Sequence, residues 1–187
     1  MEPEHIHSPS VISKGRLEFL FDGIFAIAMT ILVLELKIPE LVDRRSMGEL
    51  ARELAHHAPT FGSYLLSFAM LGMFWYRHNH QYHHFLRITE GMLALHFVQL
   101  AAAAFFPFCA ALFGRYPRNG LSVVVYVGCI LVYLWAMAAN WIVAKRGGAL
   151  SAEVTAADYL RTRTKALLGC LVISIVFTAV VIEALVH

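Results

Sequence analysis

Residues 16–38 of the chain read RLEFLFDGIFAIAMTILVLELKI, and this stretch decides the fold. It carries about 20 predominantly apolar residues, the number that crosses a bilayer core of about 30 Å as a helix. One acid, Asp22, stands inside the run, and a carboxylate in a membrane is costly unless it finds a partner or water. The stretch therefore predicts a membrane-spanning helix that packs around a polar network or lines a path.

The composition of the whole chain agrees with a membrane protein. Of the 187 residues, 59% are hydrophobic and only 15% are charged, whereas a soluble domain carries about 25% charged residues. The formal net charge is +2, so nothing indicates a nucleic-acid partner. Because no alternating strand pattern is present, we predict an all-α integral membrane protein with a single transmembrane domain over residues 1–187.

Hydropathy indicates a bundle of five transmembrane helices. The predicted spans cover residues 17–38, 59–82, 90–114, 120–145 and 165–186. A charged, helix-like stretch at 47–57 precedes the second span, and a polar linker separates the last two. With a cytoplasmic N-terminus, nine Lys and Arg residues lie on the inner side and six on the outer side. The positive-inside rule therefore favours that orientation for a multi-pass protein of the cell (inner) membrane.

The first helix presents two different faces. At about 100° per residue, one stripe contains bulky aliphatic residues, namely Leu20, Ile24, Ile27, Ile31, Leu34 and Ile38. Asp22 lies about 140° from Ile27 around the axis. The stripe fits lipid or core packing, and it fits equally an apolar constriction that gates by dewetting. The angle of Asp22 favours a structural role, with Arg16 or a group on another helix as its partner.

The same helix carries a motif, Arg16-Leu17-Glu18-Phe19-Leu20-Phe21-Asp22-Gly23. It resembles the first helix of the lysosomal potassium channel family (transmembrane protein 175) in its prokaryotic branch. The family signature is Arg, three residues, then Phe-Ser-Asp-Gly. Arg16, Asp22 and Gly23 match, while Leu20 and Phe21 replace the Phe and Ser of the motif.

Two later stretches carry the same resemblance. Ser67-Phe68, Phe74-Trp75 and His78-Asn79 resemble the end of the family's second helix. Phe106-Pro107-Phe108, with Leu112 and Gly114-Arg115-Tyr116, resembles the end of its third. The three blocks stand in order across residues 16–116. Single-repeat members of the family have six transmembrane helices, one more than hydropathy indicates here.

The resemblance implies a potassium-permeable channel in the lipid bilayer, a homotetramer whose pore is lined by the first helix of each subunit. It implies a pore constriction of Ile27, Ile31 and Leu34, flanked by Thr30 in a hydroxyl layer connected with potassium preference. A structural network behind the pore helix would comprise Arg16, Asp22, Gly23, Trp75, His78 and Asn79. Since no TVGYG-like run is present, we expect a hydrophobic constriction with modest selectivity for K+ over Na+. No cofactor is expected, and K+ is the permeant ion.

A histidine-rich segment, RHNHQYHH at 77–84, supports rival hypotheses. His80 and His84 are one helical turn apart, and together with His83 they have the spacing of a histidine box, as in membrane di-iron enzymes. Only His56-His57 is paired elsewhere, which argues against an enzyme. The segment also fits a solvated helix end or a pH-sensitive or metal-binding site. A further alternative is a non-conducting membrane protein or a transporter subunit, although no inverted repeat is evident.

Metal analysis of the purified protein separates the enzyme from the other hypotheses. We expect no stoichiometric iron, because one histidine box supplies too few ligands for a di-iron centre. Stoichiometric iron that survives dialysis against a chelator would support the enzyme instead.

Overall fold

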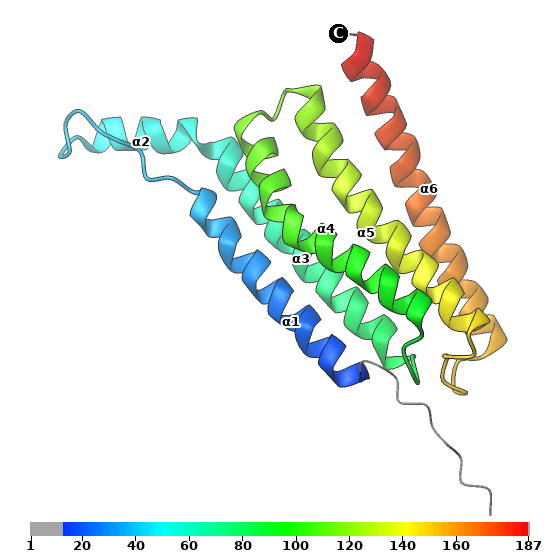
Figure 1. Cartoon of the computed structure of the whole chain (residues 1–187). Coiled ribbons are helices and arrows are strands. Elements are labelled where there is room, and N and C mark those ends of the chain that lie inside the picture. Colours follow the sequence, from blue (N-terminus) through cyan, green and yellow to red (C-terminus); the bar gives the residue numbers. More distant parts are fainter. Residues whose placement is uncertain (1–12, 187) are drawn as a thin grey trace, which may run out of the picture.

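The computed structural model describes residues 13–186, with side chains described through residue 183. The chain forms α1 (Lys14–Ile31), α2 (Met47–His56), α3 (Ala58–His83), α4 (Glu90–Arg115), α5 (Gly120–Arg146) and α6 (Ala156–Val186). A short 3-10 helix, η1 (Leu32–Glu35), continues α1. Between residues 13 and 186 no strand occurs, so the predicted all-α class is confirmed. The helix α1 lies at one edge of the bundle and α6 at the other (Figure 1).

Five of the helices are long, and they overlap the five predicted spans. Among the described residues, four segments are both long and apolar enough to cross a membrane: Lys14–Glu35, Glu90–Arg115, Gly120–Arg146 and Ala156–Glu183. The helix α3 is as long as α4 but more polar, and its buried face includes Ser63, Ser67 and His78. The membrane span at 59–82 thus stays a prediction. The remaining helix, α2, is the charged stretch that was expected to be helix-like at 47–57.

Two helix ends differ from the predicted boundaries, and each has a local cause. The α-helical part of α1 stops at Ile31 and tightens into η1, instead of continuing to residue 38. Pro39 disfavours helical backbone at the residue before it, so the helix cannot continue through residue 38. The helix α6 starts at residue 156, before the predicted span 165–186, which it contains. Thr155 caps it, because its hydroxyl accepts from the Asp158 N–H at 3.1 Å and donates to the Asp158 carboxylate at 2.6 Å.

The connection from η1 to α2 is held by one carboxylate. Ser46 caps α2 by accepting from the N–H of Glu49, and the Glu49 carboxylate accepts from the N–H groups of Val42 and Asp43 at 2.9 and 3.1 Å. These hydrogen bonds lower the pKa of Glu49 below its usual value. The helix α2 projects sideways from the bundle, at the end where α1 stops (Figure 1).

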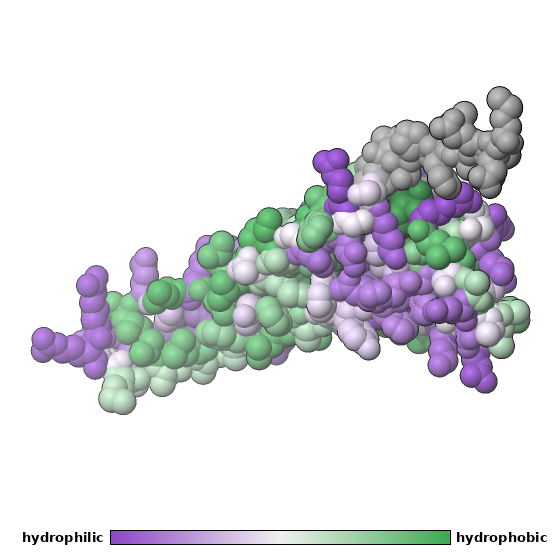
Figure 2. Space-filling model, turned by 90° about the horizontal axis from the view of Figure 1, so that it is seen from below, coloured by the Kyte–Doolittle hydropathy of each residue, from purple (hydrophilic) through white to green (hydrophobic). Residues whose placement is uncertain are grey.

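At the opposite end of the bundle, hydrogen bonds tie the start of α1 to the end of α3, and tie the α3–α4 connection to the α5–α6 connection. Lys14 Nζ donates to the carbonyl of Phe85 at 2.7 Å, and the Tyr82 hydroxyl donates to the carbonyl of Lys14 at 2.8 Å. The N–H of Leu86 donates to the carbonyl of Ala149 in the α5–α6 connection. Figure 2 looks onto this end, where hydrophilic residues gather, while the flanks of the bundle are hydrophobic. That distribution is the one expected of helices that cross a bilayer.

The core lies among α1, α3, α4 and α5. Phe74 and Tyr133 stack with ring centroids 4.3 Å apart, and the edge of Phe25 meets Tyr133 at 6.1 Å. Phe106 meets Phe74 in an edge-type contact, with ring centroids 5.9 Å apart. The helix α6 packs against α5 and leaves most of its surface exposed.

Near the α2 end, α3 and α4 approach closely at a glycine. A Cβ added to Gly114 would lie 3.0 Å from the Cβ of Ser63 and 3.3 Å from the Cα of Thr60. The hydroxyl of Ser63 also donates to the carbonyl of Ala110 at 2.7 Å, which fastens the two helices together. Only glycine fits here without moving one helix.

Gly114→Ala is expected to lower thermal stability in detergent, because the added methyl group overpacks the contact at a cost of about 1–3 kcal/mol. The matched control is Gly62→Ala on α3, where an added Cβ meets nothing within 4 Å. Thermal unfolding of both variants checks this, and equal midpoints would contradict the close approach.

Candidate functional site

One face of α1 is buried against α3 and α4, and its buried residues are spaced three or four positions apart. Its members are Leu17, Phe21, Phe25, Ala28 and, at the start of η1, Leu32. The ring of Phe21 lies flat on the imidazole of His78, with centroids 3.6 Å apart and planes 10° apart. The edge of His96 meets the same ring at 5.5 Å. This packing sets the rotation of α1 about its axis.

The predicted pore residues lie on the uncovered face of α1 and of its continuation η1, which carries Leu34. Ile27 is 59% exposed and Leu34 is 72% exposed, and Ile31 and Thr30 are exposed between them. Gly23 lies on the same side, with open space around it. Within residues 13–183 no helix covers this face, so the structure brings the four predicted residues together on one apolar surface.

The hydroxyl of Thr30 is engaged with its own helix. It donates to the carbonyls of Ala26 and Ile27, at 3.0 and 2.8 Å. A hydroxyl bonded back to the preceding turn bends a helix slightly. This bond lies one residue before the α-helical part of α1 ends.

Asp22 lies at the edge between the buried and uncovered faces. It is exposed, and its carboxylate accepts a hydrogen bond from the indole N–H of Trp75 on α3 at 2.8 Å. Arg16 is also exposed, and no ion pair links it to Asp22 in the part of the chain that the structure describes. The structure therefore joins Asp22 to Trp75 within the proposed network and leaves Arg16 apart.

The other two members of that network take different positions. His78 is buried and contacts Phe21 rather than Asp22, while Asn79 is half-buried. Phe21 occupies the place of the serine in the expected motif, so an aromatic stack stands where a hydroxyl was expected. Polar contact to Asp22 from α3 comes through Trp75.

Behind α1, the structure reveals a buried polar layer that the sequence reading did not single out. His96 Nδ1 donates to the carbonyl of Met92 at 2.7 Å, which leaves Nε2 to accept from the Asn140 amide at 3.2 Å. Gln99 is fully buried beside them. His78 Nε2, both polar atoms of the Gln99 amide and Asn140 Oδ1 have no hydrogen-bond partner among the described residues. His96, Gln99 and Asn140 are polar residues inside apolar spans, and that is the signal that could have found the layer.

The histidine cluster lies on the outside of α3, near its end. His80 and His84 have ring centroids 5.3 Å apart, and the edge of His84 meets Trp141 on α5 at 5.8 Å. His83 is exposed. No group of three or more His, Cys, Asp or Glu residues that could hold a metal ion occurs within the described residues.

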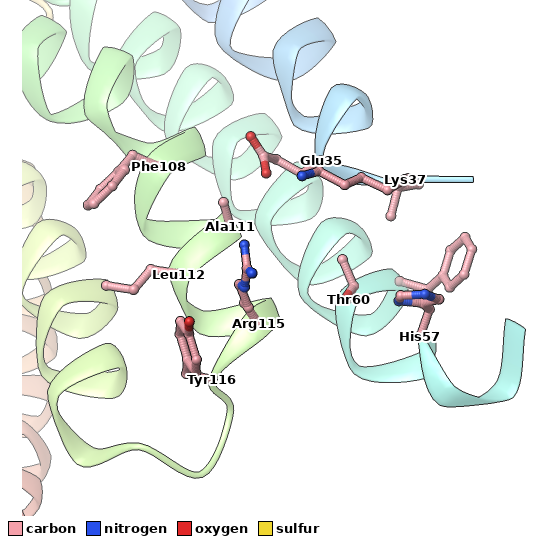
Figure 3. Close-up of a pocket in the computed structure, with 11 residues that line it drawn as sticks. Glu35, Lys37, His57, Thr60, Phe108, Ala111, Leu112, Arg115 and Tyr116 are labelled. Carbon is pink, nitrogen blue, oxygen red and sulfur yellow. The ribbon is translucent and has the colours of Figure 1, made fainter. Parts of the chain in front are cut away.

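A cavity of about 570 Å³ lies beside the far end of α1, between η1, α3 and α4. Glu35 of η1 and Arg115 of α4 both reach into it, and Lys37 and His57 stand at its border (Figure 3). Because groups of both signs line the cavity, it does not favour a ligand of one charge. The cavity is relevant to the predicted pore residues because it lies directly beyond Leu34, at the end of the uncovered face.

Comparison with known proteins identifies the family. The sequence profile of a family described as the endosomal/lysosomal potassium channel TMEM175 matches residues 16–107. A potassium channel of Chamaesiphon minutus is 31% identical over 144 residues, which cover 72% of this chain and 70% of that relative. The chain belongs to the TMEM175 family.

Other relatives and a solved structure extend this picture. A potassium channel of Streptomyces collinus is 28% identical over 163 residues, covering 84% of this chain and 78% of the relative. The human endosomal/lysosomal proton channel TMEM175 is 32% identical over 137 residues, which are 69% of this chain but 27% of the human protein. The crystal structure of a lysosomal potassium-selective channel TMEM175 homolog from Chamaesiphon minutus has the same fold, with a TM-score of 0.76 and 24% identity over 92% of this chain and 89% of that chain.

The matched region of the TMEM175 family covers α1, α3 and most of α4. It therefore includes the uncovered face of α1, the Asp22–Trp75 bond and the Phe21–His78 stack. The resemblance inferred from the three sequence blocks is confirmed at the level of the family. The roles of the individual residues stay predictions.

We expect Trp75→Phe and Asp22→Ala to lower the stability of the folded protein by similar amounts, because each removes the same hydrogen bond. A double-mutant cycle measured by thermal unfolding in detergent should give a coupling energy of about 0.5–3 kcal/mol. Strictly additive effects would show that the two side chains act independently.

Proposed function

We propose that the protein is a potassium-permeable cation channel, a homotetramer in which α1 of each subunit lines a central pore. The observation that carries the proposal is the apolar face of α1 and η1 bearing Ile27, Ile31 and Leu34, which its own subunit leaves uncovered. The names of the bacterial relatives, both potassium channels, support it.

A pore requires more than one copy of the chain, because a single helix face cannot enclose a path. Four copies of the α1 face around an axis would place rings of isoleucine and leucine opposite one another. Such rings keep a narrow pore free of water, and a modest widening admits hydrated cations. The constriction thus acts as a hydrophobic gate.

Selectivity for K+ over Na+ is expected to be modest. Among the described residues, the uncovered face has no ring of backbone carbonyls, since α1 is helical throughout this region. Thr30 supplies a hydroxyl oxygen beside the constriction. A hydroxyl layer discriminates between cations less strictly than a cage of carbonyl oxygens.

The channel hypothesis stands against two alternatives. The family is described as a channel family, and this description decides against the di-iron enzyme. In a non-conducting membrane protein, the uncovered aliphatic residues of α1 would serve only to pack against lipid or another subunit. For the cell, we propose a multi-pass protein of the cell membrane with its N-terminus in the cytoplasm, supported by the basic residues around the start of α1 and the end of α5.

Ile27→Ala is expected to raise basal K+ flux several-fold in liposomes that contain the purified protein, because a smaller side chain makes the constriction wider and easier to wet. The measurement is flux driven by K+, Na+ and impermeant-cation gradients, with a pH-sensitive dye to detect protons. Ile175→Ala on the exposed face of α6 is the matched control and should leave the flux unchanged.

Unchanged K+ flux in both Ile27→Ala and Ile31→Ala would show that α1 does not line the pore. Flux of protons without K+ would indicate the activity named for the mammalian relatives. Flux of the impermeant cation would indicate leakage rather than a channel.

A further inference from the structure

A groove runs between α3 and α6 on the outside of α5, near the end where α3 stops. It encloses about 300 Å³. The wall from α3 contributes Arg77, His80 and His84, and the wall from α6 contributes Thr162 and Lys165. The proposed channel function assigns no role to this groove or to the histidine-rich segment that forms one side of it.

The charge of the groove has one sign. Arg77 and Lys165 are cationic, and the imidazoles of His80 and His84 and the hydroxyl of Thr162 are further hydrogen-bonding groups. None of the residues that line the groove is acidic. Several donors without a neighbouring carboxylate suit an anion with several oxygen atoms, such as a phosphate group.

The walls of the groove are fixed by hydrogen bonds beneath it. The amide of Gln81 donates to the carbonyl of Met137 at 2.9 Å, which holds α3 to α5. The indole N–H of Trp141 donates to the carbonyl of Tyr159 at 3.4 Å, which holds the start of α6 to α5. The cationic groups therefore stand on a preformed frame rather than on loops.

The position of the groove along α3 is compatible with the surface region of a bilayer. The 26 residues of α3 span about 39 Å, whereas the hydrocarbon core is about 30 Å thick. Arg77 lies six residues before the end of α3, or about 9 Å from it. With α3 centred on the bilayer, the backbone of Arg77 would lie about 4–5 Å inside the hydrocarbon, from where its long side chain would reach the headgroups.

An apolar extension leads from the groove along the bundle. A smaller cavity of about 60 Å³ shares Arg77 and Lys165 with the groove and is otherwise lined by residues that include Leu134, Gly169 and Ile173. A Cβ added to Gly169 would meet nothing within 4 Å, so the surface there is open. A free phosphate ion has no use for such a strip, whereas an acyl chain can lie along it.

We propose that this groove binds the phosphate of an anionic phospholipid, with Arg77 and Lys165 at the phosphate and an acyl chain along Leu134 and Ile173. Basic pockets between membrane helices bind headgroups of this kind. The proposal does not rest on the channel function, because binding is measured without flux.

The test uses the delipidated full-length protein in detergent, titrated with phosphatidylglycerol, phosphatidylcholine or glycerol 3-phosphate and followed by native mass spectrometry and thermal unfolding. We expect phosphatidylglycerol to bind and to raise the unfolding midpoint, and the other two to have little effect. Each basic residue near a headgroup is expected to change affinity about fivefold, so Arg77→Gln/Lys165→Gln should weaken binding about 30-fold. Arg163→Gln, on the same helix but outside the groove, is the control and should bind as the wild type does, and Arg77→Lys should retain most of the affinity.

Three results would overturn the proposal. Equal phosphatidylglycerol binding by the double variant and the wild type would place the lipid elsewhere. Equal binding of glycerol 3-phosphate would show a site for soluble phosphates. Dissociation of the oligomer in the double variant would identify a second copy of the chain as the occupant of the groove.

Discussion

The contact between Phe21 and the buried imidazole of His78 fixes how α1 is turned, and the rest of the site depends on it. Successive residues lie about 100° apart around a helix, so the burial of one residue determines which of the others face outward. With Phe21 inside, Ile27 and Leu34 must point away from the subunit. The bond from Trp75 to Asp22 holds the flank of the same helix. An aromatic ring in place of the motif serine thus stabilises the orientation by area and stacking instead of by a hydroxyl.

The histidines of α3 serve two different surfaces because of their spacing. His78 and His80 are two residues apart, which places them on nearly opposite sides of a helix. His78 enters the core beside α1, whereas His80 and His84 face the groove toward α6. A single short segment therefore connects the packing behind the proposed pore with the outer surface of the subunit.

Hydropathy and helical angles predict much of this arrangement, and single polar side chains explain most of what they miss. The apolar runs locate five long helices, and the 140° between Asp22 and Ile27 separates the acid from the ladder. The helix α6 contains the predicted span 165–186 and begins earlier, at the capping pair Thr155 and Asp158, in a stretch read as a polar linker. Gln99 and Asn140 were overlooked because a single polar residue hardly changes the mean hydropathy of a strongly apolar span. Which helix faces Asp22 depends on packing between distant segments, and the spacing within one helix does not contain that information.

The hydrogen bonds that the Thr30 hydroxyl donates to its own helix determine which interactions its oxygen can make on the uncovered face. The only proton of the hydroxyl is used by the carbonyls of Ala26 and Ile27, so outward the oxygen presents lone pairs alone. A ring of such oxygens around an axis would accept hydrogen bonds from water and would attract cations. It would supply no hydrogen-bond donor to an anion. Discrimination by the sign of the charge would then arise from the helical backbone itself, without any acidic residue on the uncovered face.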